Sequence, residues 1–435
     1  MLQNMIGGLQ GMVDHALVGR FVGFTANAGI GVSWQIFLVV MVFMSSLFTG
    51  MAVLVARFVG AGEADKVDRV VYQACLTAVC LGLFVMAPVG YLSAPRLLEF
   101  VNATPEVRAE ALPFLRIMFT FSIGMLMFFM LSVALRAAGD PKTPLRLGLL
   151  LTVLNVVLNV MLIPAMGTAG AATGTVIAGA VVSSVGLWKL FSGTAVIKMT
   201  RRMRWTPDWS IIRALFRFGL PTGFQGIAMN IAGVFLIRFI GSLQDSAAAQ
   251  AAYSVAYTEL FSLITWTSVG LMGATSVVAG QNLGACHPER AVRAVQVTAR
   301  IGLSVAAVVG ALFLVVPGWL LSLFGMTDPD VVALGRQLLR YLSLSGLFVT
   351  VALAYTGALQ GTGDTRSPFY ISVISQIVIP LGLCALVQAT RGLTPADIWL
   401  AIVLGHVTRA ILSVVRFRQG KWQQIGVDIE RAAVG

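Results

Sequence analysis

The most constraining feature of this chain is a series of long stretches without any Asp, Glu, Lys or Arg. There are nine of them, at 21–56, 70–95, 117–135, 147–188, 218–237, 260–288, 301–327, 341–363 and 367–390. An α-helix needs about 20 mostly apolar residues to cross the hydrocarbon core of a bilayer. Apolar residues make up 57% of the chain and charged residues only 11%, whereas soluble domains have about 25% charged residues. The sequence therefore predicts a polytopic membrane protein and excludes a soluble enzyme or a disordered chain.

The predicted fold is all-α, with about twelve membrane-spanning helices. A break at 164–167 divides the 42-residue stretch 147–188 into two spans with a tight turn between them, and one more span lies near 395–416. A β-barrel is excluded because the apolar runs are continuous and do not alternate. The expected spans lie near 1–20, 30–57, 70–93, 112–136, 143–165, 169–190, 213–240, 250–280, 292–323, 333–360, 367–389 and 395–416.

The basic residues predict the orientation. If both termini are cytoplasmic, the inner loops and adjoining helix ends hold 22 of the 30 Lys and Arg, including Arg409 and Arg416. Positively charged loops stay on the cytoplasmic side, so the net charge of +12 is assigned to the membrane and not to nucleic acid. We expect a multi-pass protein of a bacterial-type inner (plasma) membrane.

A loop motif occurs twice, 224 residues apart. Residues 135–144 (LRAAGDPKTP) recur as 359–368 (LQGTGDTRSP), and the same offset aligns Gly60-Ala61 with Gly284-Ala285. Two loop motifs that share one offset predict two homologous halves of six helices, related as parallel repeats. The expected division is an N-terminal lobe (1–191), a basic cytoplasmic linker (192–212), a C-terminal lobe (213–418) and a cytoplasmic tail (419–435).

The repeat also bears on the first helix. The second half begins with Leu220-Pro221, whose counterpart would fall before Met1. The first helix is therefore expected to lack its front portion, and the alternative is a naturally short helix accommodated by tilt or bilayer thinning.

The repeated motif predicts two tight turns. In each turn Gly gives the backbone conformational freedom after the first helix, Asp caps the next helix, and Pro lies in the first turn of that helix. We expect a structural role and not substrate contact for Gly139, Asp140, Pro144, Gly363, Asp364 and Pro368.

Several kinds of chemistry are disfavoured. The four cysteines form no CxxC pair, so a metal or redox centre is not expected. The segment Gly60-Ala-Gly-Glu63 lacks the GxxxxGK[ST] pattern of a phosphate-binding loop. We expect no cofactor, no certain metal site and no enzymatic activity.

Two acidic residues lie well inside predicted spans: Asp14 in the first and Glu259 in the eighth. A carboxylate at that depth costs roughly 2.5–3.5 kcal/mol or more, so each should face a cavity and bind a proton or cation. The alternative for Asp14 is a buried ion pair or capped acid without a transport role. For Glu259 it is simple pairing with Arg238 on the neighbouring helix.

Neutral polar residues supply further candidates. Asn155 and Asn159 share one helix face, and together with Thr175 they complete an ion or proton site or serve as interhelical hydrogen bonds. Gly170 and Gly174 fit close helix packing, and His406 is read as a packing histidine more readily than as a ligand. Weaker candidates for a substrate cavity are Gln35, Gln225, Asn230 and Tyr257.

The whole chain resembles the MATE (multidrug and toxic compound extrusion) transporters. The resemblance rests on Val13-Asp14 with Val18-Gly19, the Gly60-Ala-Gly62 loop, the paired GD…P turns, Gly170 to Thr175 and Leu220-Pro221. It implies a V-shaped pair of six-helix lobes that exports cationic or amphipathic drugs against H⁺ or Na⁺. We expect such a chain to act as a monomer in the lipid bilayer.

The resemblance also maps the helix-one carboxylate of the family onto Asp14. The Asn-xxx-Asp of the fifth helix falls on Asn155 and Asn159, so an amide replaces the second carboxylate. One carboxylate with two amides favours H⁺ over a tightly held Na⁺, with Glu259 contributing in the second lobe. The alternatives are a lipid-linked precursor flippase of the same superfamily, for which Arg238 and Arg116 would supply positive charge, and a non-transporting scaffold.

Overall fold

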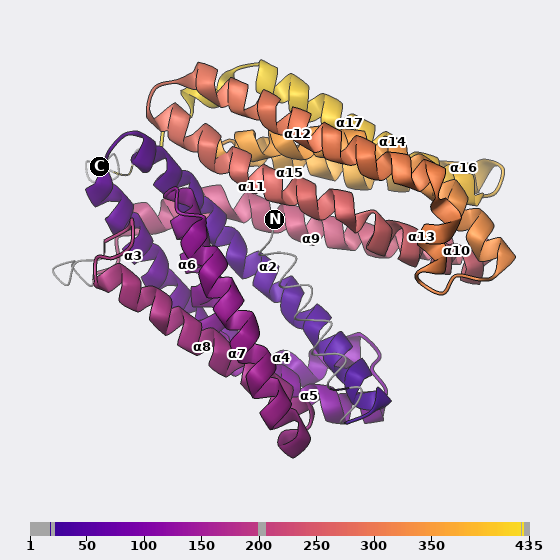
Figure 1. Cartoon of the computed structure of the whole chain (residues 1–435), viewed down its shortest axis with the longest axis horizontal. Helices are drawn as coiled ribbons and strands as arrows, with labels where there is room; N and C mark the ends of the chain where they lie inside the picture. Colours follow the sequence, from indigo (N-terminus) through magenta and orange to yellow (C-terminus); the bar gives the residue numbers. More distant parts are fainter. Residues whose placement is uncertain (1–17, 19–21, 199–205, 428, 430–435) are drawn as a thin grey trace. The chain divides into compact units, whose positions relative to one another are not determined.

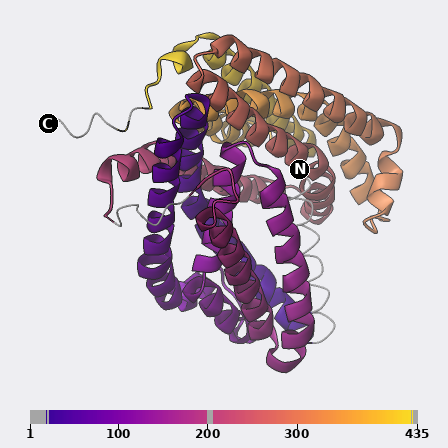
Figure 2. The same cartoon turned by 60° about the vertical axis from the view of Figure 1, so that its left-hand side comes forward.

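The structure is a computed structural model that describes Val18, residues 22–198, residues 206–427 and Ile429. Within these ranges it is built from helices joined by short loops, without strands (Figures 1 and 2). The elements before residue 200 are α2 (Phe24–Gly60), α3 (Ala64–Cys80), η1 (Leu81–Met86), α4 (Ala87–Phe100), α5 (Pro105–Thr120), α6 (Ile123–Ala137), α7 (Lys142–Met166) and α8 (Thr168–Phe191).

The remaining elements follow Asp208. They are α9 (Trp209–Gly241), α10 (Ser246–Tyr253), η2 (Ser254–Leu260), α11 (Ser262–Gly284), α12 (Pro288–Val315), α13 (Pro317–Ser322), α14 (Pro329–Thr362), α15 (Arg366–Val373), η3 (Ile374–Val378), α16 (Ile379–Thr390), α17 (Pro395–Arg418) and η4 (Lys421–Gln424).

Ten of the described helices are long and apolar enough to cross a membrane. The pair α5 and α6, bent by 54° at its break, raises the number to eleven if it forms one span. These coincide with eleven predicted spans, and the span predicted near 1–20 lies outside the described residues apart from Val18. The predicted all-α polytopic membrane fold is confirmed.

Three of the long helices contain a π-helical segment. These are η1 between α3 and α4, η2 between α10 and α11, and η3 between α15 and α16. A π-turn widens the helix locally and is often found at functional sites. The segments η2 and η3 have no counterpart 224 residues earlier, where α2 and α7 run as uninterrupted α-helices.

The chain forms two compact units, one made mainly of residues 2–223 and the other of Phe224–Val427. We call them the N unit and the C unit. The division falls inside α9, whose first turns pack on α2 within the N unit. This packing is close: a Cβ added to Gly50 would collide with the Leu215 carbonyl, and one added to Gly219 would lie 2.8 Å from the Leu47 Cα. Glycine at these positions therefore lets the two helices approach. The lobe boundaries expected from sequence stay a prediction.

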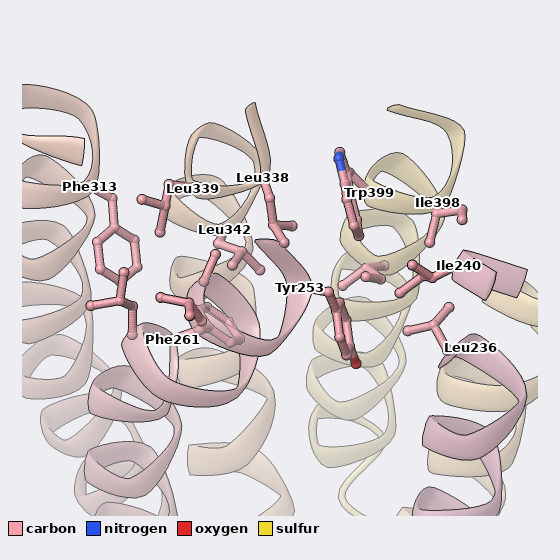
Figure 3. Close-up of a cluster of buried hydrophobic side chains, with 14 of the residues drawn as sticks. Leu236, Ile240, Tyr253, Phe261, Phe313, Leu338, Leu339, Leu342, Ile398 and Trp399 are labelled. Carbon is pink, nitrogen blue, oxygen red and sulfur yellow. The ribbon is translucent and has the colours of Figure 1, made fainter. Parts of the chain in front are cut away.

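The C unit is organised around α14. This helix packs against α11, α12 and α17, and its leucines Leu338, Leu339 and Leu342 are completely buried. Figure 3 shows them in the middle of an apolar cluster, with Phe261 and Phe313 to one side and Tyr253 and Trp399 to the other. Because α14 is surrounded by protein, it carries few lipid-facing residues.

The two GD…P turns have the same backbone geometry. Gly139 and Gly363 adopt positive φ angles of 93° and 104°, which glycine tolerates best. The amide after each glycine closes the helix: Asp140 N donates to Leu135 O (2.9 Å) and Asp364 N to Leu359 O (2.8 Å). These are the bonds of a Schellman cap.

The aspartates of the two turns differ in their surroundings. Asp140 Oδ1 accepts hydrogen bonds from the amides of Lys142 and Thr143, both at 3.0 Å. Burial raises the pKa of Asp140, but hydrogen bonds from Thr143 and Lys142 outweigh it and hold the pKa below its usual value. Asp364 accepts from Ser367 N (3.2 Å) and also forms a 2.8 Å ion pair with Arg416 of α17. Asp364 thus joins two elements, whereas Asp140 caps one helix.

We expect Asp364→Ala to destabilise the protein more than Asp140→Ala. Loss of a cap costs about 1 kcal/mol, which is the expected effect at Asp140. At Asp364 the change also leaves the partly exposed guanidinium of Arg416 without its ion-pair partner. We therefore expect the free energy of unfolding to fall by about 2–3 kcal/mol in total. Unfolding of the purified variants in detergent measures the difference. Equal losses, or a selective change in the exported drugs at unchanged protein level, would contradict this structural role.

A second pair of turns shows the same repeat. Gly62 has φ of 75°, and Cys286, 224 residues later, has φ of 61°. The surrounding bonds correspond, since Glu63 N donates to Phe58 O (2.9 Å) and His287 N to Asn282 O (2.8 Å). The second turn therefore holds a cysteine in a conformation that costs a non-glycine residue roughly 1–2 kcal/mol.

Cys286→Gly is expected to stabilise the protein by about 0.5–1 kcal/mol. Relief of the backbone strain should stabilise the folded state by roughly 1–2 kcal/mol. The greater conformational freedom of glycine in the unfolded chain should offset roughly 0.5–1 kcal/mol of this gain. The matched change Gly62→Cys should destabilise by a similar amount. Thermal unfolding of both variants tests the pair, and a lower melting temperature for Cys286→Gly would show that the turn is not strained.

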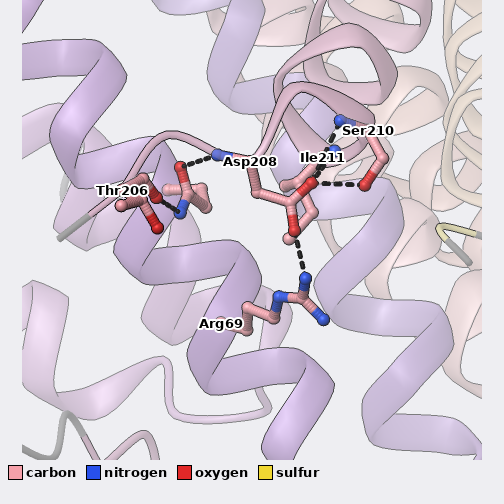
Figure 4. A network of polar contacts seen from close by, with 6 residues as sticks. Arg69, Thr206, Asp208, Ser210 and Ile211 are labelled. Atoms are coloured by element: carbon pink, nitrogen blue, oxygen red, sulfur yellow. Dashed lines mark hydrogen bonds and ion pairs between the residues drawn. The ribbon is translucent and has the colours of Figure 1, made fainter. Parts of the chain in front are cut away.

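The segment before α9 is fixed to α3. Asp208 pairs with Arg69. Gln73 Nε2 donates to Thr206 O (3.0 Å), and Asp208 N donates to Gln73 Oε1 (3.1 Å) (Figure 4). Asp208 Oδ1 also accepts from Ser210. Burial raises the pKa of Asp208, but the bonds from Ser210 and Arg69 lower it overall. The start of α9 is therefore held on α3 by one ion pair and by hydrogen bonds from and to Gln73.

Candidate functional site

The N unit contains a buried amide cluster formed by Asn155, Asn159 and Thr175. Asn155 Nδ2 donates to Thr175 Oγ1 (2.9 Å), and Asn159 Nδ2 donates to Asn155 Oδ1 (3.3 Å). Both asparagines are fully buried, and Thr175 is 5% exposed. The structure thus brings together three residues that the sequence analysis placed in one candidate site.

The turn between α7 and α8 creates this cluster. Gly167, with φ of 61°, reverses the chain, and the two helices then pack along their length. Gly174 faces Asn159, and a Cβ on Gly174 would collide with Asn159 Oδ1. The absence of a side chain at Gly174 therefore leaves room for the amide.

The amide cluster offers uncharged oxygen and nitrogen atoms. Asparagine and threonine oxygens can accept a hydrogen bond or coordinate a cation, but they supply no negative charge. Among the described residues there is no group of three or more His, Cys, Asp or Glu side chains that could hold a metal ion. The carboxylate expected to complete the site, Asp14, lies outside the described residues.

The second predicted acid, Glu259, lies on η2. Its side chain is exposed on the surface of the C unit. Across the described chain no ion pair joins it to Arg238, which is also exposed. The pairing considered from sequence is thus not formed, and a coupling role for Glu259 stays a prediction.

The four weaker cavity candidates are divided between the two units. Gln35 belongs to the N unit, the other three belong to the C unit, and their role in a cavity stays a prediction. Gln225 is buried, donates to Ser372 Oγ (2.7 Å) and accepts from Gln360 (3.2 Å). Asn230 is exposed and bonds its own helix at Gly226 O (2.9 Å). The other two, Gln35 and Tyr257, are exposed and half-buried respectively.

Sequence reasoning missed a buried arginine inside the C unit. Arg409, assigned to the cytoplasmic end of its helix, is only 5% exposed and lies two turns before the end of α17. One turn earlier, His406 is buried and its Nδ1 lies 2.5 Å from Ser345 Oγ of α14. The helical spacing of His406 and Arg409 was the available signal, but only tertiary packing shows that both face the protein interior.

Glu110 forms a further polar contact, with Thr168, that was not expected from the sequence. Thr168 Oγ1 donates to its Oε2 and to its main-chain carbonyl, both at 3.0 Å. Glu110 lies in the second turn of α5 and so joins this helix to the start of α8. Its position two residues before the expected span explains why it was read as a helix-end residue.

Together, the long apolar helices and the repeated turns define a polytopic membrane protein with an internal duplication. The chain belongs to the MatE family, whose model matches residues 1–161 and 221–386. It is therefore a membrane transporter and not an enzyme, and ion-coupled antiport is typical of the family.

Curated relatives match over nearly the whole length. The "Probable multidrug resistance protein NorM" of Thermotoga maritima is 26% identical over 433 residues, covering 98% of this chain and 91% of the relative. The "Multidrug resistance protein MdtK" of Yersinia pseudotuberculosis is 25% identical, covering 97% and 94%.

Solved structures share the fold. An outward-facing MATE family transporter of the MOP superfamily aligns with a TM-score of 0.88 at 20% identity, covering 98% of this chain and 94% of that one. A MOP superfamily transporter from Pyrococcus furiosus, described as having a binding pocket of reverse polarity, aligns with a TM-score of 0.89 at 20% identity and the same coverage.

Proposed function

We propose that this protein is a secondary active multidrug exporter that moves cationic or amphipathic compounds out of the cell in exchange for H⁺. The observation that carries the proposal is the match along almost the entire chain to relatives named as multidrug resistance proteins. Family membership supplies the transporter class. We extend the drug substrates from the names of these relatives to this chain.

The choice of H⁺ over Na⁺ rests on the amide cluster. A hard cation in a low-dielectric site needs compensating negative charge. Asn155, Asn159 and Thr175 supply only neutral groups, so a single carboxylate, proposed to be Asp14, would carry the charge. A carboxylate in such a site is readily protonated because burial raises its pKa.

The proposed arrangement in the cell follows from the basic loops. We place the protein as a monomer in a bacterial-type inner membrane, with both termini and the 192–212 linker cytoplasmic. The two repeated halves, 1–191 and 213–418, would alternate access to the two sides, as parallel repeats do in other transporters.

The flippase alternative receives less support. Recognition of a lipid-linked pyrophosphate needs several cationic side chains in one place. Of the two arginines considered, Arg116 lies over the ring of Tyr91 (4.5 Å to its centroid) and Arg238 is exposed on the C unit.

Transport by everted vesicles tests the proposal. Uptake of a cationic dye such as ethidium is followed under an imposed pH gradient or an imposed sodium gradient, with the membrane voltage clamped. We expect uptake driven by the pH gradient alone. Uptake that follows the sodium gradient at constant pH would overturn the proton assignment, and no uptake under either gradient would overturn drug export.

A further inference from the structure

The interior of the C unit contains a buried cation without a counter-charge. Arg409 is 5% exposed, its Nε has no hydrogen-bond partner, and no described carboxylate lies within 4.0 Å of its guanidinium. Arg416, two turns further along α17, is instead paired with Asp364. An unpaired arginine within a membrane span is costly to maintain, so such residues usually mark a functional site.

The groups around Arg409 are hydrogen-bond donors and aromatic rings. His406 and Tyr257 are close enough to interact with it electrostatically. One turn beyond, Ser413 Oγ is fully buried and without a partner.

The two π-helical segments of the C unit flank this region. Tyr257 belongs to η2, and η3 packs on α17, where Ser375 of η3 has a buried hydroxyl without a partner. Tyr257 stacks on Phe261 (5.5 Å between centroids), which stacks on His406 (5.9 Å). This row of rings runs from half-buried Tyr257 to the buried histidine, one helical turn before Arg409.

We propose that Arg409 binds the carboxylate of an aromatic, monoanionic compound that the protein transports. The planar guanidinium matches the two oxygens of a carboxylate, and the buried hydroxyls of Ser413 and Ser375 are further donors. One cation balances one negative charge, which favours a carboxylate over a phosphate dianion. The aromatic rings of Tyr257 and His406, which lie near Arg409, favour an aromatic body for the compound through contacts with their edges. The proposal rests on the proposed export function, of which it names a substrate class.

Ligand-induced thermal stabilisation of the purified full chain tests the site without any gradient. We use benzoate as the probe, with acetate, chloride and neutral benzamide as comparisons. A ligand at saturating concentration stabilises the folded state, so benzoate should raise the melting temperature by roughly 2–4 °C. Benzamide and chloride should not, and acetate should have a smaller effect because it lacks the ring.

Variants assign the effect to Arg409. Arg409→Gln should abolish the benzoate shift, and Arg409→Lys, which keeps the charge but loses the planar fork, should reduce it. Arg238→Gln, an exposed arginine of the same unit, should retain it. If Arg409→Gln does not fold, the benzoate shift of Arg409→Lys tests the proposal.

The proposal is overturned if benzoate stabilises no better than benzamide, if chloride alone gives the full shift, or if Arg409→Lys leaves the benzoate shift unchanged. Failure of this proposal and failure of the export proposal give different results. Ethidium uptake without a benzoate shift refutes only the carboxylate site, whereas a benzoate shift without ethidium uptake refutes only export of cationic drugs.

Discussion

We expect the Asp14→Asn variant to lose uphill drug export entirely while still inserting into the membrane. An asparagine cannot release a proton, so the variant would lack the group whose protonation couples the pH gradient to the conformational cycle. The nearly equal size of the two side chains should preserve packing. The measurement is ethidium uptake by everted vesicles under an imposed pH gradient, at matched protein levels.

Glu259→Gln provides the comparison for this change. Because Glu259 is exposed on its unit, we expect its replacement to weaken export only partly. Full export by Asp14→Asn would remove Asp14 from the mechanism. A greater loss with Glu259→Gln than with Asp14→Asn would move the main coupling site to the C unit.

Gly174→Ala should disrupt the amide cluster. The new methyl group would occupy the position of Asn159 Oδ1, which would force the amide away from Asn155. Overpacking of this kind costs about 1–3 kcal/mol, and we expect export to fall by about tenfold because the proton site loses its hydrogen-bonding neighbours. Thermal unfolding and vesicle uptake measure the two effects.

The matched control is Gly273→Ala in α11. A Cβ at Gly273 meets nothing within 4 Å, so alanine there should leave stability unchanged or slightly higher through its better helix propensity. Wild-type stability and export in Gly174→Ala would show that Asn159 can move without consequence. Equal losses in both variants would indicate a general effect of removing glycine from these helices.

The sequence by itself determined the class of fold. Uncharged stretches of about 20 residues can only be helices in lipid, because every backbone amide must find its partner within the segment. The ten long apolar helices that the structure describes, and the bent pair of α5 and α6, were therefore predictable one by one. The 224-residue offset also predicted the repeated turns, because glycine at a positive φ angle and aspartate at a helix start have local causes.

The sequence also named the three residues that lie together in the amide cluster. Asn155 and Asn159 share a helix face by their spacing of four, and the tight turn at 164–167 makes α8 the neighbour of α7. Thr175 then lies opposite the two asparagines. This contact depends on short-range connectivity, which local signals specify.

Only the tertiary structure decided which polar residues are enclosed. Helical periodicity gives the relative angle of Glu259, His406 and Arg409 on their helices, but not whether a neighbouring helix or lipid covers that face. The packing of α14 against α17 buries His406 and Arg409, whereas Glu259 on η2 remains exposed. Likewise, Asp364 pairs with Arg416 and Asp140 does not, although their local motifs are alike. Burial and ion pairing depend on residues distant in sequence, so no local pattern could specify them.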